Sequence, residues 1–93
     1  MIEGNVYASV PVALADIPER AANLRARAEL MHQIARIVKK SGWTQTEAAQ
    51  RCSVTQPRMS NLFRGRVSGF SLDALINIAT ALGRRVHVEV EAA

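Results

Sequence analysis

The sequence predicts an all-α fold, and three observations lead to this class. Apolar residues recur with the 3.6-residue period of a helix over residues 18–40 and again over residues 71–83. Between these two segments, residues 44–65 have the pattern of two short capped helices joined by a tight turn. The chain is 48% apolar but only 4% aromatic, which favours a compact helical core over a β-sandwich.

Residues 1–17 are predicted to form an N-terminal arm outside the core, because they contain Gly4 and Pro11 and show no helical period. Their apolar side chains have two possible uses. They pack on the helices or on the C-terminal tail, or they form a surface that a protein partner covers. The candidate partner-binding residues are Val6, Tyr7, Val10, Val12, Leu14 and Ile17.

A long helix is predicted from Pro18 to about Lys40. Proline is tolerated in the first turn of a helix, and Gly42 supplies a left-handed stop. Lys39 and Lys40 suit the negative end of the helix dipole. The predicted buried stripe consists of Leu24, Ala28, Met31, Ile34, Ala35, Ile37 and Val38.

The two short helices have matching start signals. Thr44 and Glu47 form the pattern of a capping box, in which each side chain accepts a hydrogen bond from the backbone of the other. Thr55 is predicted to cap the second helix through the amide of Arg58, with Pro57 in the first turn.

The apolar positions of this segment fit two helices that cross steeply, and they are Ala48, Cys52, Val54, Met59 and Leu62. Ala49 is small where the two helices would approach most closely. A plain helical hairpin is the alternative, but the caps, the turn and the small residue together are typical of a DNA-binding helix-turn-helix.

A further helix is predicted to begin after the capping residue Ser71 and to end at Gly83. Its expected buried residues are Leu72, Leu75, Ile76, Ala79 and Leu82. In the tail, residues 84–93, apolar and polar residues then alternate, which predicts a β-strand. Its partner is the same strand of a second subunit or the arm. We favour the dimer, with Val86, Val88 and Val90 as dimerisation residues.

Positive charge is concentrated around the predicted helix-turn-helix. Residues 30–72 contain one acidic residue, Glu47, and these basic residues: Arg36, Lys39, Lys40, Arg51, Arg58, Arg64 and Arg66. A solvated face is the simpler reading of such a stretch. Its coincidence with the helix-turn-helix favours a surface for the phosphates of double-stranded DNA.

Other function classes have little support in the sequence. The single cysteine, Cys52, excludes an internal disulfide, and the spacing of His32 and His87 gives no metal-binding motif. Without a nucleophile elbow, a P-loop or paired carboxylates, we expect neither an enzyme nor a cofactor. Residues 6–15 resemble a signal-peptide core but follow Glu3 and no basic residue. No apolar run approaches membrane-spanning length, so we expect a cytoplasmic protein.

The sequence resembles the lambda-repressor-like, or Xre, helix-turn-helix family. The resemblance covers about residues 20–91 and rests on WTQTEAAQRCSVTQPRMSNLFRG followed by FSLDALINIATALGRRVHVEV. Within the family it is similar to the subgroup of HigA-type antitoxins and small repressors. It implies a bundle of four to five helices, with residues 55–64 as the recognition helix. Residues 18–83 would then be the DNA-binding domain.

The resemblance also implies contact roles. Gln45 matches a phosphate-binding position, Gln56 the principal base reader, Asn61 a second reader, and Arg64 another phosphate contact. Helical geometry independently turns Pro57, Ser60, Asn61 and Arg64 outward when Met59 and Leu62 face inward. The candidate DNA-binding residues are Gln45, Thr55, Gln56, Pro57, Arg58, Ser60, Asn61, Arg64 and Arg66.

The chain departs from the family in the turn, where Ser53 stands in place of the usual glycine. A left-handed conformation there would cost a non-glycine residue about 1 kcal/mol.

The leading hypothesis is a dimeric, sequence-specific transcriptional repressor that is the antitoxin of a toxin–antitoxin pair and represses its own operon. A stand-alone regulator without a toxin is the first alternative. A protein-interaction module that has lost DNA binding is the second.

Overall fold

The computed structural model describes residues 17–92. This part of the chain forms α2 (Pro18–Ser41), α3 (Gln45–Cys52), α4 (Gln56–Phe63), the short 3₁₀ helix η1 (Val67–Gly69) and α5 (Leu72–Ala81). The prediction of an all-α fold is confirmed for these residues, which contain four α-helices and no strand.

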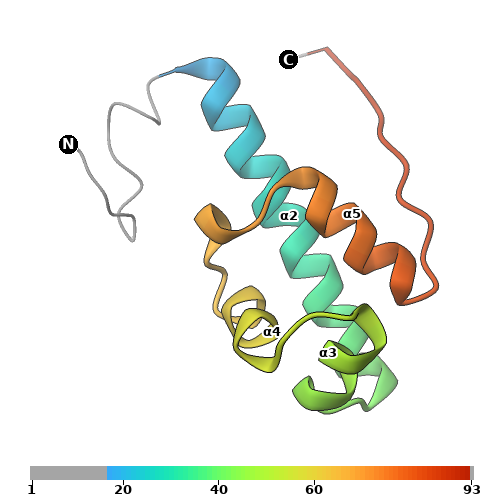
Figure 1. Cartoon of the computed structure of the whole chain (residues 1–93). Coiled ribbons are helices and arrows are strands. Elements are labelled where there is room, and N and C mark those ends of the chain that lie inside the picture. The colour runs from blue at the N-terminus through green and yellow to red at the C-terminus, as the bar shows by residue number, and fades with distance from the viewer. Residues whose placement is uncertain (1–16, 93) are drawn as a thin grey trace.

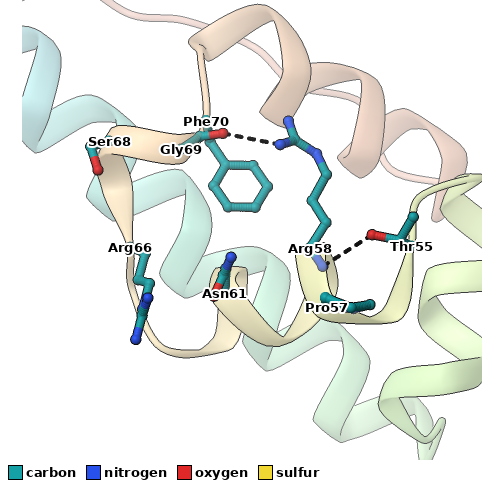
Figure 2. A pocket seen from close by; sticks show the side chains of 8 residues that line it. All are labelled: Thr55, Pro57, Arg58, Asn61, Arg66, Ser68, Gly69 and Phe70. Atoms are coloured by element: carbon teal, nitrogen blue, oxygen red, sulfur yellow. Dashed lines mark hydrogen bonds between the residues drawn. The ribbon is translucent and has the colours of Figure 1, made fainter.

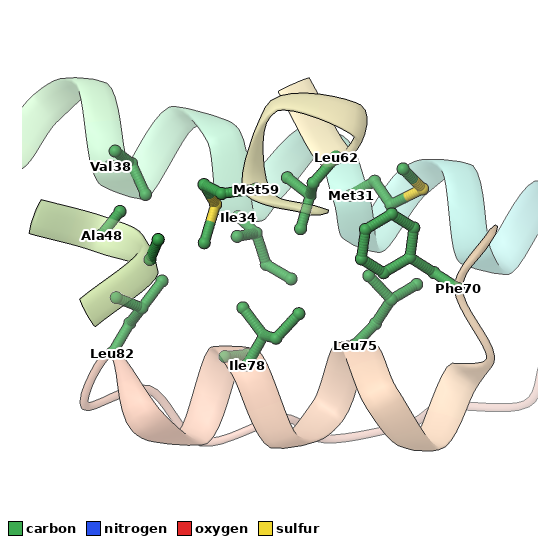
Figure 3. Packing of buried hydrophobic residues seen from close by; sticks show 12 residues of the cluster. Met31, Ile34, Val38, Ala48, Met59, Leu62, Phe70, Leu75, Ile78 and Leu82 are labelled. Atoms are coloured by element: carbon green, nitrogen blue, oxygen red, sulfur yellow. The ribbon is translucent and has the colours of Figure 1, made fainter. Parts of the chain in front are cut away.

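Helices α2 and α5 lie side by side, α4 packs against α2, α3 packs against α5, and α3 and α4 pack on each other (Figure 1). The core lies between α2 and α5 and is closed by side chains of α3, α4 and Phe70 (Figure 3). Its buried residues are Met31, Ile34, Val38, Ala48, Ala49, Met59, Leu62, Phe70, Leu75, Ile78, Ala79 and Leu82.

Helix α2 begins and ends where the sequence predicts. Pro18 occupies its first turn, and Gly42 ends it in a left-handed conformation (φ 76°) while donating its N–H to the Lys39 carbonyl. The prediction that Ala28 is buried is wrong, because Ala28 is exposed. The start of α2 extends past the other described helices (Figure 1), and the fully buried residues of α2 begin only at Met31.

Both predicted caps of the helix-turn-helix segment are confirmed. In the capping box, Thr44 Oγ1 accepts from the Glu47 N–H at 3.0 Å and Glu47 Oε1 accepts from the Thr44 N–H at 2.8 Å. At the start of α4, Thr55 Oγ1 accepts from the Arg58 N–H at 3.2 Å. These bonds satisfy amides that have no partner inside their helices.

The turn between α3 and α4 contains a left-handed serine. Ser53 has φ 57° and ψ 39°, and its N–H donates to the Gln50 carbonyl at 3.2 Å. The Val54 N–H reaches back to the Ala49 carbonyl at 3.0 Å. Ala48 and Ala49 are both buried, which agrees with the inward position predicted for Ala48 and with the small side chain predicted for Ala49 beside the second helix.

Helix α5 follows the capping residue Ser71, whose Oγ accepts from the Ala74 N–H at 3.1 Å. Leu75, Ala79 and Leu82 are buried as predicted, and Ile78 joins them. The burial predicted for Leu72 and Ile76 is wrong. Both are half-buried because they lie beside the stripe that faces α2.

The predicted C-terminal strand is absent, because residues 84–92 have no regular secondary structure. The Arg84 N–H donates to the Ala79 carbonyl at 3.1 Å, and within the described chain residues 85–92 make no backbone hydrogen bond. Alternation favours a strand only when a neighbouring strand is present, and the described residues supply none. Val86 packs partly against the core, whereas Val88 and Val90 are 80% and 95% exposed.

The Ser53→Gly substitution should stabilise the protein by a few tenths to about 1 kcal/mol, because glycine adopts the left-handed conformation without a Cβ clash. Chemical denaturation measures this as a higher midpoint. Ser60→Gly is the control, since Ser60 lies inside α4 and glycine there should lower the midpoint. A lower midpoint for Ser53→Gly would show that the left-handed serine carries no strain.

Candidate nucleic-acid interface

Helix α4 has one face in the core and the opposite face open. Met59 and Leu62 are 0% and 2% exposed, which confirms the predicted orientation of the helix. On the other side, Pro57 and Arg64 are exposed, while Ser60 and Asn61 are half-buried. Gln56 is exposed as the first residue of the helix. Amide and guanidinium side chains therefore project from a helix whose direction is fixed by the core.

The sequence-predicted residues fall into two groups around a hollow beside α4 (Figure 2). The hollow is lined by Thr55, Pro57, Arg58, Asn61, Arg66, Ser68, Gly69 and Phe70. Five of the predicted residues are in this lining: Thr55, Pro57, Arg58, Asn61 and Arg66. The remaining four lie outside it: Gln45, Gln56, Ser60 and Arg64.

The Arg58 side chain makes contacts within the protein. Its Nη1 donates to the Gly69 carbonyl at 3.1 Å, and its guanidinium lies 4.4 Å from the centre of the Phe70 ring (Figure 2). The sequence suggested a side chain free to contact a phosphate or a base. The structure instead places its terminus against the loop after α4, where stacking on an aromatic ring adds to the hydrogen bond.

Thr55 and Gln45 lie at the starts of their helices. The Thr55 hydroxyl already accepts the capping bond, so an external acceptor would receive its proton. Gln45 is the first residue of α3 and is half-buried. Because a helix N-terminus carries partial positive charge and free N–H groups, this end of α3 suits an anionic oxygen.

Sequence reasoning missed the contribution of η1 to the hollow, namely Ser68 and Gly69, together with Phe70. A weak signal was available, because these residues follow the predicted recognition helix directly and lie next to Arg66. Sequence reasoning also missed Arg27 of α2, whose Nη1 donates to the carbonyls of Val67 at 3.1 Å and Phe70 at 3.0 Å.

Other kinds of site find little support in residues 17–92. This part of the chain has no group of three or more His, Cys, Asp or Glu side chains placed to hold a metal ion. Partial burial raises the pKa of the Cys52 thiol, which keeps it protonated and poorly nucleophilic. Among the described helices, none combines the length and apolar character needed to cross a membrane.

Comparison with known families agrees with this geometry. A family described as a helix-turn-helix domain matches residues 13–91. The chain belongs to this family, since the match spans most of its length. No individual curated protein matches the sequence significantly. The family match shows a helix-turn-helix domain and does not distinguish the Xre family or its HigA-type subgroup.

Substitutions on α4 should separate base reading from phosphate binding. We expect Gln56→Ala and Asn61→Ala each to cost about 1–3 kcal/mol on a cognate DNA site and little on random DNA. Arg64→Ala should weaken binding to both DNAs and lower the slope of log affinity against log salt by about 1. Fluorescence anisotropy with the two DNAs measures these effects.

The matched control is Gln50→Ala, because Gln50 is an exposed glutamine on α3 rather than α4. Its affinity for both DNAs should remain unchanged. Equal losses on cognate and random DNA for the Gln56 and Asn61 variants would contradict their assignment as base readers.

Proposed function

We propose, on the premise that this chain is a helix-turn-helix protein, that it is a cytoplasmic, sequence-specific DNA-binding repressor. One observation carries the proposal. Helix α4 is fixed to the core by Met59 and Leu62, while Gln56 is exposed at its leading end and Asn61 lies on the side turned away from the core. A rigid helix with outward amides matches what the major groove of DNA requires of a reader.

The side chains of this surface cover both parts of DNA recognition. Gln and Asn form paired hydrogen bonds with adenine, and Arg forms them with guanine. The exposed Arg64 and Arg66 suit phosphates, as does the N-terminal end of α3 at Gln45. The candidate interface therefore contains groups that position the protein on DNA and groups that distinguish bases.

A homodimer is part of the proposal. Val88 and Val90 are largely exposed, and the tail around them makes no backbone hydrogen bond within the described chain. Pairing with the same segment of a second copy would cover these side chains and satisfy the backbone groups. A two-fold dimer on a pseudo-palindromic operator would present two copies of α4 to successive major grooves and block the promoter sterically.

An antitoxin role is the more specific form of the proposal. It is supported by the resemblance to HigA-type antitoxins and by the apolar arm. Of the candidate partner-binding residues, Ile17 is exposed at the start of α2, and Val6, Tyr7, Val10, Val12 and Leu14 lie outside the described residues. A stand-alone regulator would lack a neighbouring gene for a small basic protein that is toxic when expressed alone.

Selection from random DNA tests the function directly. The full chain should enrich one pseudo-palindromic sequence whose half-site centres lie about 10 base pairs apart. Deleting residues 87–93, which keeps the half-buried Val86, should give a monomer that binds one half-site weakly. Sedimentation and binding measurements report the two effects.

Removing residues 92–93 alone is the control and should leave the dimer intact. Failure to enrich any sequence would contradict sequence-specific DNA binding. An unchanged dimer mass without residues 87–93 would assign dimerisation to another surface.

Deleting residues 1–17 tests the proposed toxin contact. The shortened protein should lose toxin binding and neutralisation but keep operator binding and its melting temperature. These outcomes follow if the arm is ordered by its partner rather than by the helices. Loss of thermal stability would place the arm in the fold, and retained neutralisation would remove it from the toxin interface.

A further inference from the structure

The loop after α4 carries two polar residues of the candidate DNA interface, the predicted Arg66 and the additional Ser68. Arg66 and Ser68 line the same hollow as Asn61 (Figure 2). The loop contains only the three-residue η1 and has no side-chain cap at its start. Because 3₁₀ turns of this length have little stability of their own, the position of the loop depends on contacts from outside it.

Two arginines from different helices supply these contacts. Arg27 of α2 uses Nη1 to bind the Val67 and Phe70 carbonyls at 3.1 and 3.0 Å. Arg58 of α4 binds the intervening Gly69 carbonyl at 3.1 Å and stacks on the Phe70 ring. Guanidinium groups therefore hold three carbonyls of one short loop, and they hold it to both α2 and α4.

The placement of Arg27 in α2 is unusual for a charged residue. It lies three residues after Leu24 and four before Met31, so it shares the helix face that leads to the core. It is half-buried, and its Nε is buried without a hydrogen-bond partner within the described chain. Burying an unpartnered polar group is unfavourable, and a simple apolar residue would avoid it.

We infer that Arg27 is a positioning residue for DNA binding. It would hold the loop so that Arg66 and Ser68 meet the DNA backbone beside the bases read by α4, without touching DNA itself. This inference rests on the proposed function. If the loop occupies its binding position for only a fraction of the time, the apparent affinity falls to that fraction of its full value.

The test compares Arg27→Met, Arg27→Lys and the control Arg25→Met, all in the full chain. Methionine keeps an apolar stem but donates no hydrogen bond, whereas lysine keeps the positive charge and donates through its ammonium group. Arg25 is an exposed arginine of the same helix, so its variant removes the same charge. We expect about a tenfold loss of cognate affinity for Arg27→Met, from a loop correctly placed about one-tenth of the time. Arg27→Lys should recover most of the loss, and Arg25→Met should bind like the unmodified chain.

Hydrogen exchange without DNA supplies the second measurement. The Gly69 and Phe70 amides, which donate to Arg66 and Val67 carbonyls, should exchange faster in Arg27→Met but not in Arg25→Met. The core amides of α5 should keep their rates in both variants, which separates a released loop from a destabilised fold.

Three results would overturn the inference: cognate affinity unchanged in Arg27→Met, an equal loss in Arg25→Met, or a loss with unchanged exchange at Gly69 and Phe70. The last result would identify a direct DNA contact by Arg27. If the unmodified chain selects no DNA sequence, the proposed function fails. The exchange rates would then still report whether Arg27 holds the loop.

Discussion

The burial of one side of α4 is the constraint on which the structure depends. An isolated helix of eight residues is not stable in water, because few backbone hydrogen bonds offset the cost of its first turn. Met59 and Leu62 supply the missing stability by entering the core between α2 and α5 (Figure 3). The same contacts fix the rotation of the helix about its axis. The direction of its outward side chains is therefore a property of the core, set by residues that never meet solvent.

The parts of the fold that could be predicted from the sequence are those with local causes. A capping box needs only Thr44 and Glu47 three residues apart, and a left-handed stop needs only Gly42 after a helical segment. The left-handed conformation of Ser53 was suggested only by the family resemblance, in which a glycine usually occupies this place in the turn. Ala28 and the tail were predicted wrongly for a different reason. Periodicity describes a side chain's direction, but burial and strand formation require a neighbour that the local sequence does not specify.

The residues of the candidate site also divide into those that local sequence predicts and those that it does not. The outward face of α4 follows from helical geometry once two inward residues are known, so Asn61 and Arg64 could be named in advance. Gln56 was named from the family resemblance, as the residue at the start of the helix. The hydrogen bonds that Arg58 and Arg27 make within the protein could not be predicted from the sequence. Their acceptors are backbone carbonyls 11 to 43 residues away, and every residue has such a carbonyl. A charged residue on the apolar stripe of α2 was the only sign in the sequence that Arg27 differs from its neighbours.

The length of α2 has a consequence for communication along the molecule. Its buried residues begin at Met31, so within residues 17–92 the turns before Met31 bury less apolar surface, and we expect them to open more easily than the rest. Arg27 belongs to these turns while its guanidinium holds the loop beside α4. Unwinding α2 from its first turn as far as Arg27 would therefore release that loop, and a molecule that tightened the same turns would restrain it. Events at the start of the helix and events at the hollow are thermodynamically linked, and the linkage acts in both directions.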